Sequence, residues 1–114
     1  MGRKSDVDRT EIPPGTLYML VLKVLQGGAM HGYGIAQRIQ QISEDVLRVE
    51  EGSLYPALQR MLIKGWVTAE WRPSENNRRA RYYRLTVAGR KQLGIELSDF
   101  GRVMQAITRV IELA

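Results

Sequence analysis

The sequence contains no cysteine and a single histidine, His31. The absence of cysteine excludes disulfides, thiolate catalysis and cysteine-ligated zinc. A lone histidine with no carboxylate pair at ligand spacing offers neither a metal site nor an acid–base centre, so we expect a structural hydrogen bond from it. We therefore predict no catalytic residues, no metal and no cofactor, and a protein that is not an enzyme.

Long apolar runs are also missing. No stretch approaches the roughly 20 apolar residues that a membrane span needs. The first residues, MGRKSDVDRTEIPPG, lack the apolar centre of a signal peptide. These two absences lead us to expect a soluble, cytoplasmic protein.

Positive charge is what the chain has in excess. Its 114 residues include 17 Lys and Arg against 12 Asp and Glu, which gives a formal net charge of +5, and the sequence pI is about 9.9. The length suits one domain, and a hydrophobic content of 44% is ordinary for a chain that folds. A basic chain favours a polyanionic partner, although charge by itself is weak evidence for one.

Apolar residues at helical spacing predict three helices in the first half of the chain, within GTLYMLVLKVLQGG, HGYGIAQRIQQIS and GSLYPALQRMLIKG. We expect Gly52 or Ser53 to cap the third helix and Pro56 to lie in its first turn, where a missing N–H costs little. A short strand through Leu47 and Val49 is expected between the second and third helices.

Two strand patterns follow, WVTAEWR and ARYYRLT, with the polar turn PSENN between them. They predict a β-hairpin. Alternation along the second strand places Tyr83 and Leu85 on one face, and we expect one tyrosine face to be buried.

After Thr86 the sequence predicts one long helix. Its apolar residues step by four and three, which is a heptad seam formed by Leu93, Leu97, Phe100, Met104, Ile107, Ile111 and Ala114. About 26 helical residues would extend about 39 Å, which a three-helix core cannot cover. A second copy of the chain is the simplest partner, and packing of the helix back onto its own domain is the alternative.

Three helices, a hairpin and a long last helix are typical of a winged helix-turn-helix, whose third helix enters the DNA major groove. We therefore predict a mainly α (α+β) fold in three parts. These are a flexible arm over residues 1–14, a DNA-binding winged helix over 15–86 and a dimerisation helix over 87–114.

The candidate DNA contacts follow from this layout. Gln59 can pair with adenine and Arg60 with guanine or a phosphate, while arginines at a wing tip would neutralise phosphates and release counterions. A solvated helix face and a charged, solvated turn are the alternatives. The candidate DNA-binding residues are Gln37, Ser53, Tyr55, Gln59, Arg60, Lys64, Arg78, Arg79 and Arg81.

Three blocks, HGYGIAQRI, GSLYPALQRMLIKGWV and RRARYYRLTVAGRKQL, resemble those of the PadR-like transcriptional regulators, in the same order and at the same spacing. The resemblance covers roughly residues 15 to 100. It implies a bacterial winged-helix repressor that dimerises through its C-terminal helix and binds a palindromic operator. With one C-terminal helix, the chain resembles the short form of the family.

Short members of the family often bind flat aromatic or cationic compounds between subunits. The resemblance therefore implies a small aromatic effector and makes Phe100 a candidate residue of its cavity. The predicted dimer interface comprises Leu93, Leu97, Phe100, Met104, Ile107 and Ile111.

The leading hypothesis is thus a homodimeric, sequence-specific DNA-binding repressor that an effector releases. Two other classes stay open. An RNA-binding winged helix would share the basic wing without needing a dimer seam. A protein-interaction domain with incidental positive charge would show no salt-dependent affinity for DNA.

Overall fold

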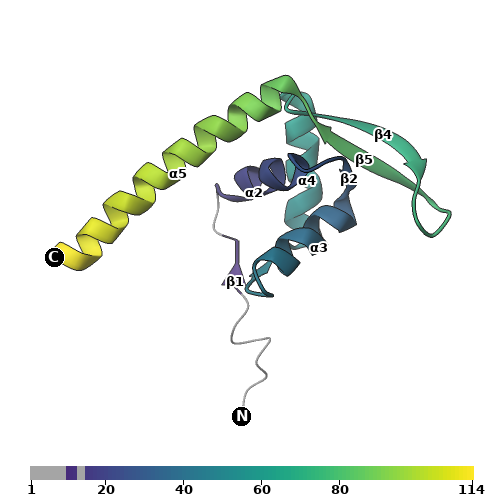
Figure 1. The fold of residues 1–114 in the computed structure, drawn as a ribbon. Coiled ribbons are helices and arrows are strands. Elements are labelled where there is room, and N and C mark those ends of the chain that lie inside the picture. The colour runs from purple at the N-terminus through teal and green to yellow at the C-terminus, as the bar shows by residue number, and fades with distance from the viewer. Residues whose placement is uncertain (1–9, 13–14) are drawn as a thin grey trace, which may run out of the picture.

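The computed structural model describes residues 10–12 and 15–114 (Figure 1). Its helices and strands are β1 (Thr10–Glu11), α2 (Leu17–Leu25), β2 (Met30–His31), α3 (Gly32–Ile42), β3 (Leu47–Arg48), α4 (Glu51–Ile63), β4 (Val67–Pro73), β5 (Arg79–Leu85) and α5 (Val87–Leu113). Strands β4 and β5 form the predicted hairpin, here called the wing, and β2 pairs with the free side of β5. This order confirms the predicted winged helix-turn-helix fold class.

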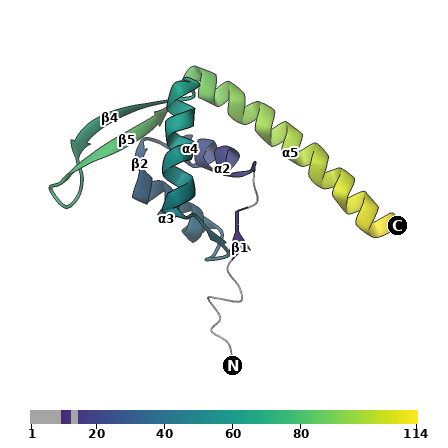
Figure 2. The same cartoon turned by 180° about the vertical axis from the view of Figure 1, so that it is seen from behind.

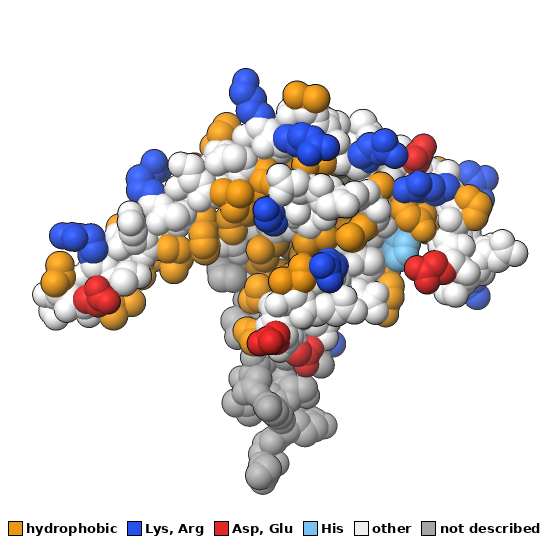
Figure 3. All heavy atoms as spheres, viewed as in Figure 1, with side chains coloured by type: hydrophobic (Ala, Val, Ile, Leu, Met, Phe, Trp, Pro, Cys, Tyr) orange, Lys and Arg blue, Asp and Glu red, His pale blue; other side chains and the backbone are white. Residues whose placement is uncertain are grey.

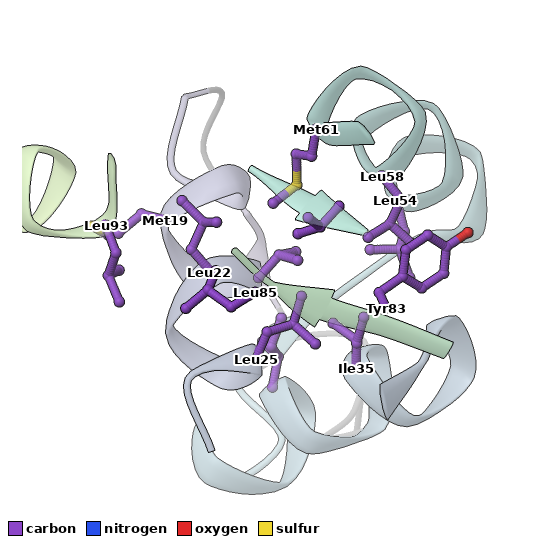
Figure 4. Close-up of a cluster of buried hydrophobic side chains, with 13 residues drawn as sticks. Met19, Leu22, Leu25, Ile35, Leu54, Leu58, Met61, Tyr83, Leu85 and Leu93 are labelled. Carbon is purple, nitrogen blue, oxygen red and sulfur yellow. The ribbon is translucent and has the colours of Figure 1, made fainter. Parts of the chain in front are cut away.

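One hydrophobic core lies between α2, α3, α4 and the base of the wing (Figure 4). Leu22, Ile35 and Leu58 are fully buried, each from a different helix. Tyr83 and Leu85 close the core from β5, which confirms the face predicted by alternation. The three helices and the wing base therefore form one packed unit, which we call the head (residues 15–86).

The long helix α5 begins at the base of the wing. Thr86 caps it, because its hydroxyl accepts the N–H of Gly89 at 3.0 Å and lies 2.7 Å from the carbonyl oxygen of Gly65. A Cβ at Gly89 would lie 2.1 Å from the carbonyl oxygen of Trp66, so only glycine allows this approach. The helix has 27 residues and is about 40 Å long. It runs away from the head after its first turns (Figures 1 and 2).

Two details of α4 and α3 differ from expectation. Helix α4 begins at Glu51 with Glu50 as N-cap, so neither Gly52 nor Ser53 caps it. Pro56 therefore lies beyond the first turn, where it cannot donate to the carbonyl of Gly52. In α3, the helical spacing of the isoleucines predicts that Ile42 shares a buried face with Ile35 and Ile39, but Ile42 is the last residue of the helix and is 60% exposed.

Part of the predicted arm is structured. Strand β1 pairs in parallel with β3, with Thr10 opposite Leu47 and Glu11 opposite Arg48. Ile12 packs against the core. Residues 1–9 and 13–14 lie outside the described part of the chain, so the flexibility of the arm stays a prediction. So do the three domain boundaries.

Candidate nucleic-acid interface

Helix α4 presents one side to solvent across its whole length. Leu54, Leu58 and Met61 anchor the opposite side in the core. Gln59 and Ile63 lie one helical turn apart on the exposed side. Ile63 is 77% exposed, so this apolar side chain is not part of the hydrophobic core of the head. Figure 2 shows α4 at the front, with the wing on one side and α5 on the other.

A hollow of about 640 Å³, here called the wing hollow, separates α4 from the wing. Its lining includes Gln37, Tyr55, Trp71, Arg78, Arg79 and Arg81. Five of the nine candidate residues thus lie around one concave surface, although they come from α3, α4, β5 and the wing turn. The register explains part of this arrangement, because Trp71 lies opposite Arg81 and Pro73 opposite Arg79 on the same face as buried Tyr83.

The turn at the wing tip is built locally. The N–H of Ser74 donates to the carbonyl of Arg78 at 2.6 Å, and the N–H of Asn77 donates to the carbonyl of Ser74 at 3.0 Å. Asn77 adopts φ +61°, a left-handed conformation that asparagine tolerates better than most residues. The turn leaves Arg78 and Arg79 exposed at the end of the hairpin.

Tyr55 and His31 are both part of the lining of the wing hollow. A Cβ at Gly32 would lie 2.7 Å from Cε1 of Tyr55, so the glycine lets this ring approach the start of α3. Burial raises the pKa of the Tyr55 phenol above its usual value, and the charge of Glu51 adds to the rise. The hydroxyl therefore stays protonated at neutral pH and can donate a hydrogen bond.

His31 makes the structural hydrogen bond that the sequence predicts. It is the N-cap of α3, and its Nδ1 accepts the N–H of Gly34 at 3.0 Å. Its ring also meets Tyr82 edge-on at 5.3 Å between centroids. Within residues 10–12 and 15–114, no group of three or more His, Asp or Glu could hold a metal ion.

A second hollow, of about 570 Å³, lies on the other flank of α4 and is here called the helix hollow. Its lining includes Tyr18, Arg48, Glu50, Ser53, Pro56 and Arg60. Ser53 and Arg60, both candidate DNA contacts, thus face away from the wing hollow. Arg60 donates from Nε to the hydroxyl of Tyr18 at 2.5 Å, a contact between α2 and α4 that the sequence does not predict.

Lys64 lies apart from both hollows. It follows the last residue of α4, and its Nζ is 5.2 Å from the centroid of the Trp66 ring. The candidate residues missed from the sequence are Tyr18 and Trp71. Trp71 is 59% exposed on the wing, and only its strand register shows that it shares a face with Arg81.

The predicted seam on α5 divides into two parts. Leu93 is 2% exposed and extends toward Met19 of α2 (Figure 4), so it belongs to the core of its own chain rather than to a surface. The following members of the seam stay exposed, by 42% at Leu97, 41% at Phe100, 40% at Met104, 44% at Ile107 and 75% at Ile111. Figure 3 shows hydrophobic side chains gathered along the underside of α5.

Three packed helices, a hairpin with arginines at its tip and a long last helix define a winged helix-turn-helix protein. The family described as transcriptional regulator PadR-like family matches residues 21–95. The chain belongs to this PadR-like family of transcriptional regulators, and the expectation that it is not an enzyme is confirmed.

Known proteins share both the sequence and the fold. A 37.1 kDa protein in transposon TN4556 of Streptomyces fradiae is 42% identical over 85 residues, which are 75% of this chain but 23% of that protein. A transcriptional regulator from Clostridium thermocellum superposes with a TM-score of 0.77 at 24% identity, over 83% of this chain and 92% of that one. A PadR family transcription regulator from Clostridium difficile gives 0.72 at 26% identity, over 85% and 99%.

No helix in the described part of the chain is both long and apolar enough to cross a membrane.

Proposed function

We propose that the protein is a sequence-specific, duplex-DNA-binding repressor that acts as a homodimer in the bacterial cytoplasm. Helix α4 enters the major groove, with Gln59 toward the base edges. The wing arginines Arg78, Arg79 and Arg81 meet the phosphate backbone, and Tyr55 and Gln37 fix the position of the helix.

The observation that carries this proposal is the wing hollow itself. It brings Tyr55 of α4 together with the three wing arginines, which outnumber Glu75, the acidic residue in its lining. A DNA strand offers both phosphates and a groove edge along such a surface, and arginine forks onto phosphate oxygens. This arrangement favours DNA, because each phosphate that an arginine neutralises releases condensed counterions and so adds to the affinity.

The exposed part of the α5 seam supports the dimer. The apolar side chains from Leu97 to Ile111 are exposed along one stripe in the single chain, and a contiguous exposed stripe of this kind is typical of an interaction surface. A two-fold dimer built on it would bind a palindromic operator.

The effector site belongs to the same interface. Phe100 lies in the middle of the stripe, and a flat aromatic compound held beside it would alter the spacing of the two heads. Glu96 and Asp99 are the nearby acids that a cationic compound would meet. Each has a neighbour on α5, since Gln92 donates to Glu96 at 3.0 Å and Arg102 lies 3.2 Å from Asp99.

The test begins with selection of bound duplexes from a random pool, which yields the operator. Replacement of both Arg78 and Arg79 by Ala should then weaken operator and scrambled duplex about equally. The slope of log affinity against log salt should flatten by about one to two units, because each arginine neutralises one phosphate. Fluorescence anisotropy over a salt series measures both.

The matched control removes two arginines from α5, by Arg102→Ala with Arg109→Ala, and should leave the salt slope unchanged. Equal slopes for the wing variant and the parent would show that these arginines only keep the turn soluble. A structured RNA bound more tightly than the operator would favour the RNA-binding alternative.

A further inference from the structure

Arg60 differs from the other candidate arginines because a residue of another helix holds it. Its Nε donates to the Tyr18 hydroxyl at 2.5 Å, and its Cζ lies 6.0 Å from the centroid of the Tyr18 ring. The Tyr18 ring in turn meets Trp66 edge-on, at 5.8 Å and an angle of 83°. A ring fixed by Trp66 thus orients the guanidinium on the flank of α4.

The orientation leaves the outer edge of the guanidinium for a ligand. Bonding through Nε uses one of five N–H donors, and the two terminal NH₂ groups can still fork onto two oxygens of one phosphate. A side chain that is already ordered loses less conformational entropy on binding. Arg60 is therefore prepared for an anion at the edge of α4 rather than for a base beneath it.

The size of the major groove indicates that this anion is a phosphate of the DNA backbone. The groove is about 12 Å wide, and a helix with its side chains is about 10–12 Å across. A helix seated in the groove consequently has a phosphate backbone along each flank. The wing hollow faces one flank with Arg78, Arg79 and Arg81, and the helix hollow faces the other with Arg60.

Among the residues that the structure describes, one acid, Glu50, lines the helix hollow and would oppose a phosphate. The negative charge of Glu50 is offset locally, because its Oε1 lies 3.4 Å from Nε of Arg48. The hollow thus contains Arg60 in addition to this ion pair, which leaves an excess of positive charge among the residues named.

We propose that Tyr18 is a positioning residue that holds Arg60 against the DNA backbone strand opposite the wing. This inference rests on the proposed function, because it needs α4 in the major groove. Arg60 then contributes affinity without sequence preference, and reading of bases by α4 falls to Gln59. The two hollows act as a pair of phosphate contacts that fix the depth and register of the helix.

A double-mutant cycle tests the proposal. Tyr18→Phe removes only the hydroxyl and should weaken operator and scrambled duplex alike, by about three- to tenfold. Arg60→Ala should flatten the salt slope by about one unit. In the Arg60→Ala background, Tyr18→Phe should have no further effect, because residues that act through one contact are not additive.

Two comparisons sharpen the cycle. Tyr82→Phe is the matched control, since Tyr82 also has an arginine over its ring, with Arg72 Cζ at 4.1 Å, but faces away from the wing hollow. It should bind as the parent does. Gln59→Ala, in contrast, should reduce the ratio of operator to scrambled affinity, whereas Tyr18→Phe should leave that ratio unchanged.

The outcomes separate this inference from the function on which it rests. A parent protein with no salt-dependent affinity for any duplex overturns both. A parent that binds, with Tyr18→Phe equal to it, overturns the role of Tyr18 alone, as do additive effects of the two changes. A lower operator preference in Arg60→Ala would show that Arg60 reads a base. If Tyr18→Phe does not fold, Arg60→Lys is a second test of the proposal. This variant should keep the salt slope and weaken binding to both duplexes equally.

Discussion

The head and the far part of α5 are built from similar apolar residues but bury them very differently. In the head, Leu22, Ile35 and Leu58 are fully enclosed by neighbouring helices. In α5, no residue from 94 to 114 is buried, a stretch that the structure describes completely. Leu93 is the last side chain of the chain to reach the core.

From this difference we expect the two regions to have different partners. The head satisfies its apolar surface within one chain, so it can hold α4 and the wing in fixed relation. The far part of α5 leaves Phe100 and Ile107 at 41% and 44% exposure in the same chain, and a helix with such a stripe is stabilised by packing against another surface. DNA contact and assembly are therefore expected to respond to different substitutions.

The largest effect is expected from a substitution in the far part of α5, because burial of its apolar stripe depends on a second copy of the chain. Ile107→Asp should dissociate the proposed dimer, because each of two copies would bury an unpaired charge at a cost of several kcal/mol. Sedimentation velocity should find monomer with an intact head, as reported by the near-ultraviolet circular dichroism signal. Gln105→Asp, at an exposed position on the outer side of α5 away from the seam, is the control and should stay dimeric. Persistence of the dimer in Ile107→Asp would contradict the proposed interface.

A smaller but still large effect is expected in the head. Leu58→Ala should lower the free energy of unfolding by about 2–5 kcal/mol, because the surrounding core cannot collapse into the cavity. Urea denaturation measures the change. Val87→Ala in α5, where the side chain is 84% exposed, should change stability by no more than about 0.5 kcal/mol. Similar losses for both would mean that the head is not the self-contained unit described above.

The smallest effect is expected at the joint between the two regions. Thr86→Ala removes the cap of α5 together with the hydroxyl contact to the carbonyl of Gly65. It should destabilise the protein by about 1 kcal/mol. Thr86→Ser retains the hydroxyl and should recover most of the loss in the same urea titration. A full loss in Thr86→Ser would assign the effect to the methyl group instead.

Much of the fold could be predicted because its signals are local. Helical spacing located α2, α3 and α4 to within three residues, and a polar turn between two alternating strands located the wing. Alternation along β5 also identified Tyr83 as a core residue. Each of these patterns depends on residues within a few positions of one another, where backbone geometry fixes which side chains share a face.

The candidate interface was less predictable from the sequence. The composition of the turn indicated arginines at a wing tip, and the helix pattern indicated an exposed Gln59. The sequence could not indicate that Arg60 turns toward Tyr18, because 42 positions separate the two residues. It also could not indicate that Trp71 shares the wing hollow with Tyr55, since only the tertiary packing of the hairpin beside the helices brings both residues to one hollow.

The sequence by itself therefore determined the order of the elements, the basic wing and the heptad stripe, because short-range periodicity and turn chemistry specify each of them. Tertiary structure alone decided that Leu93 leaves that stripe for the core and that β2 completes the sheet of the wing. It also decided that α4 has a different arginine on each flank. These features depend on how distant segments pack, since burial of one side chain is settled by the neighbours that the whole chain brings to it.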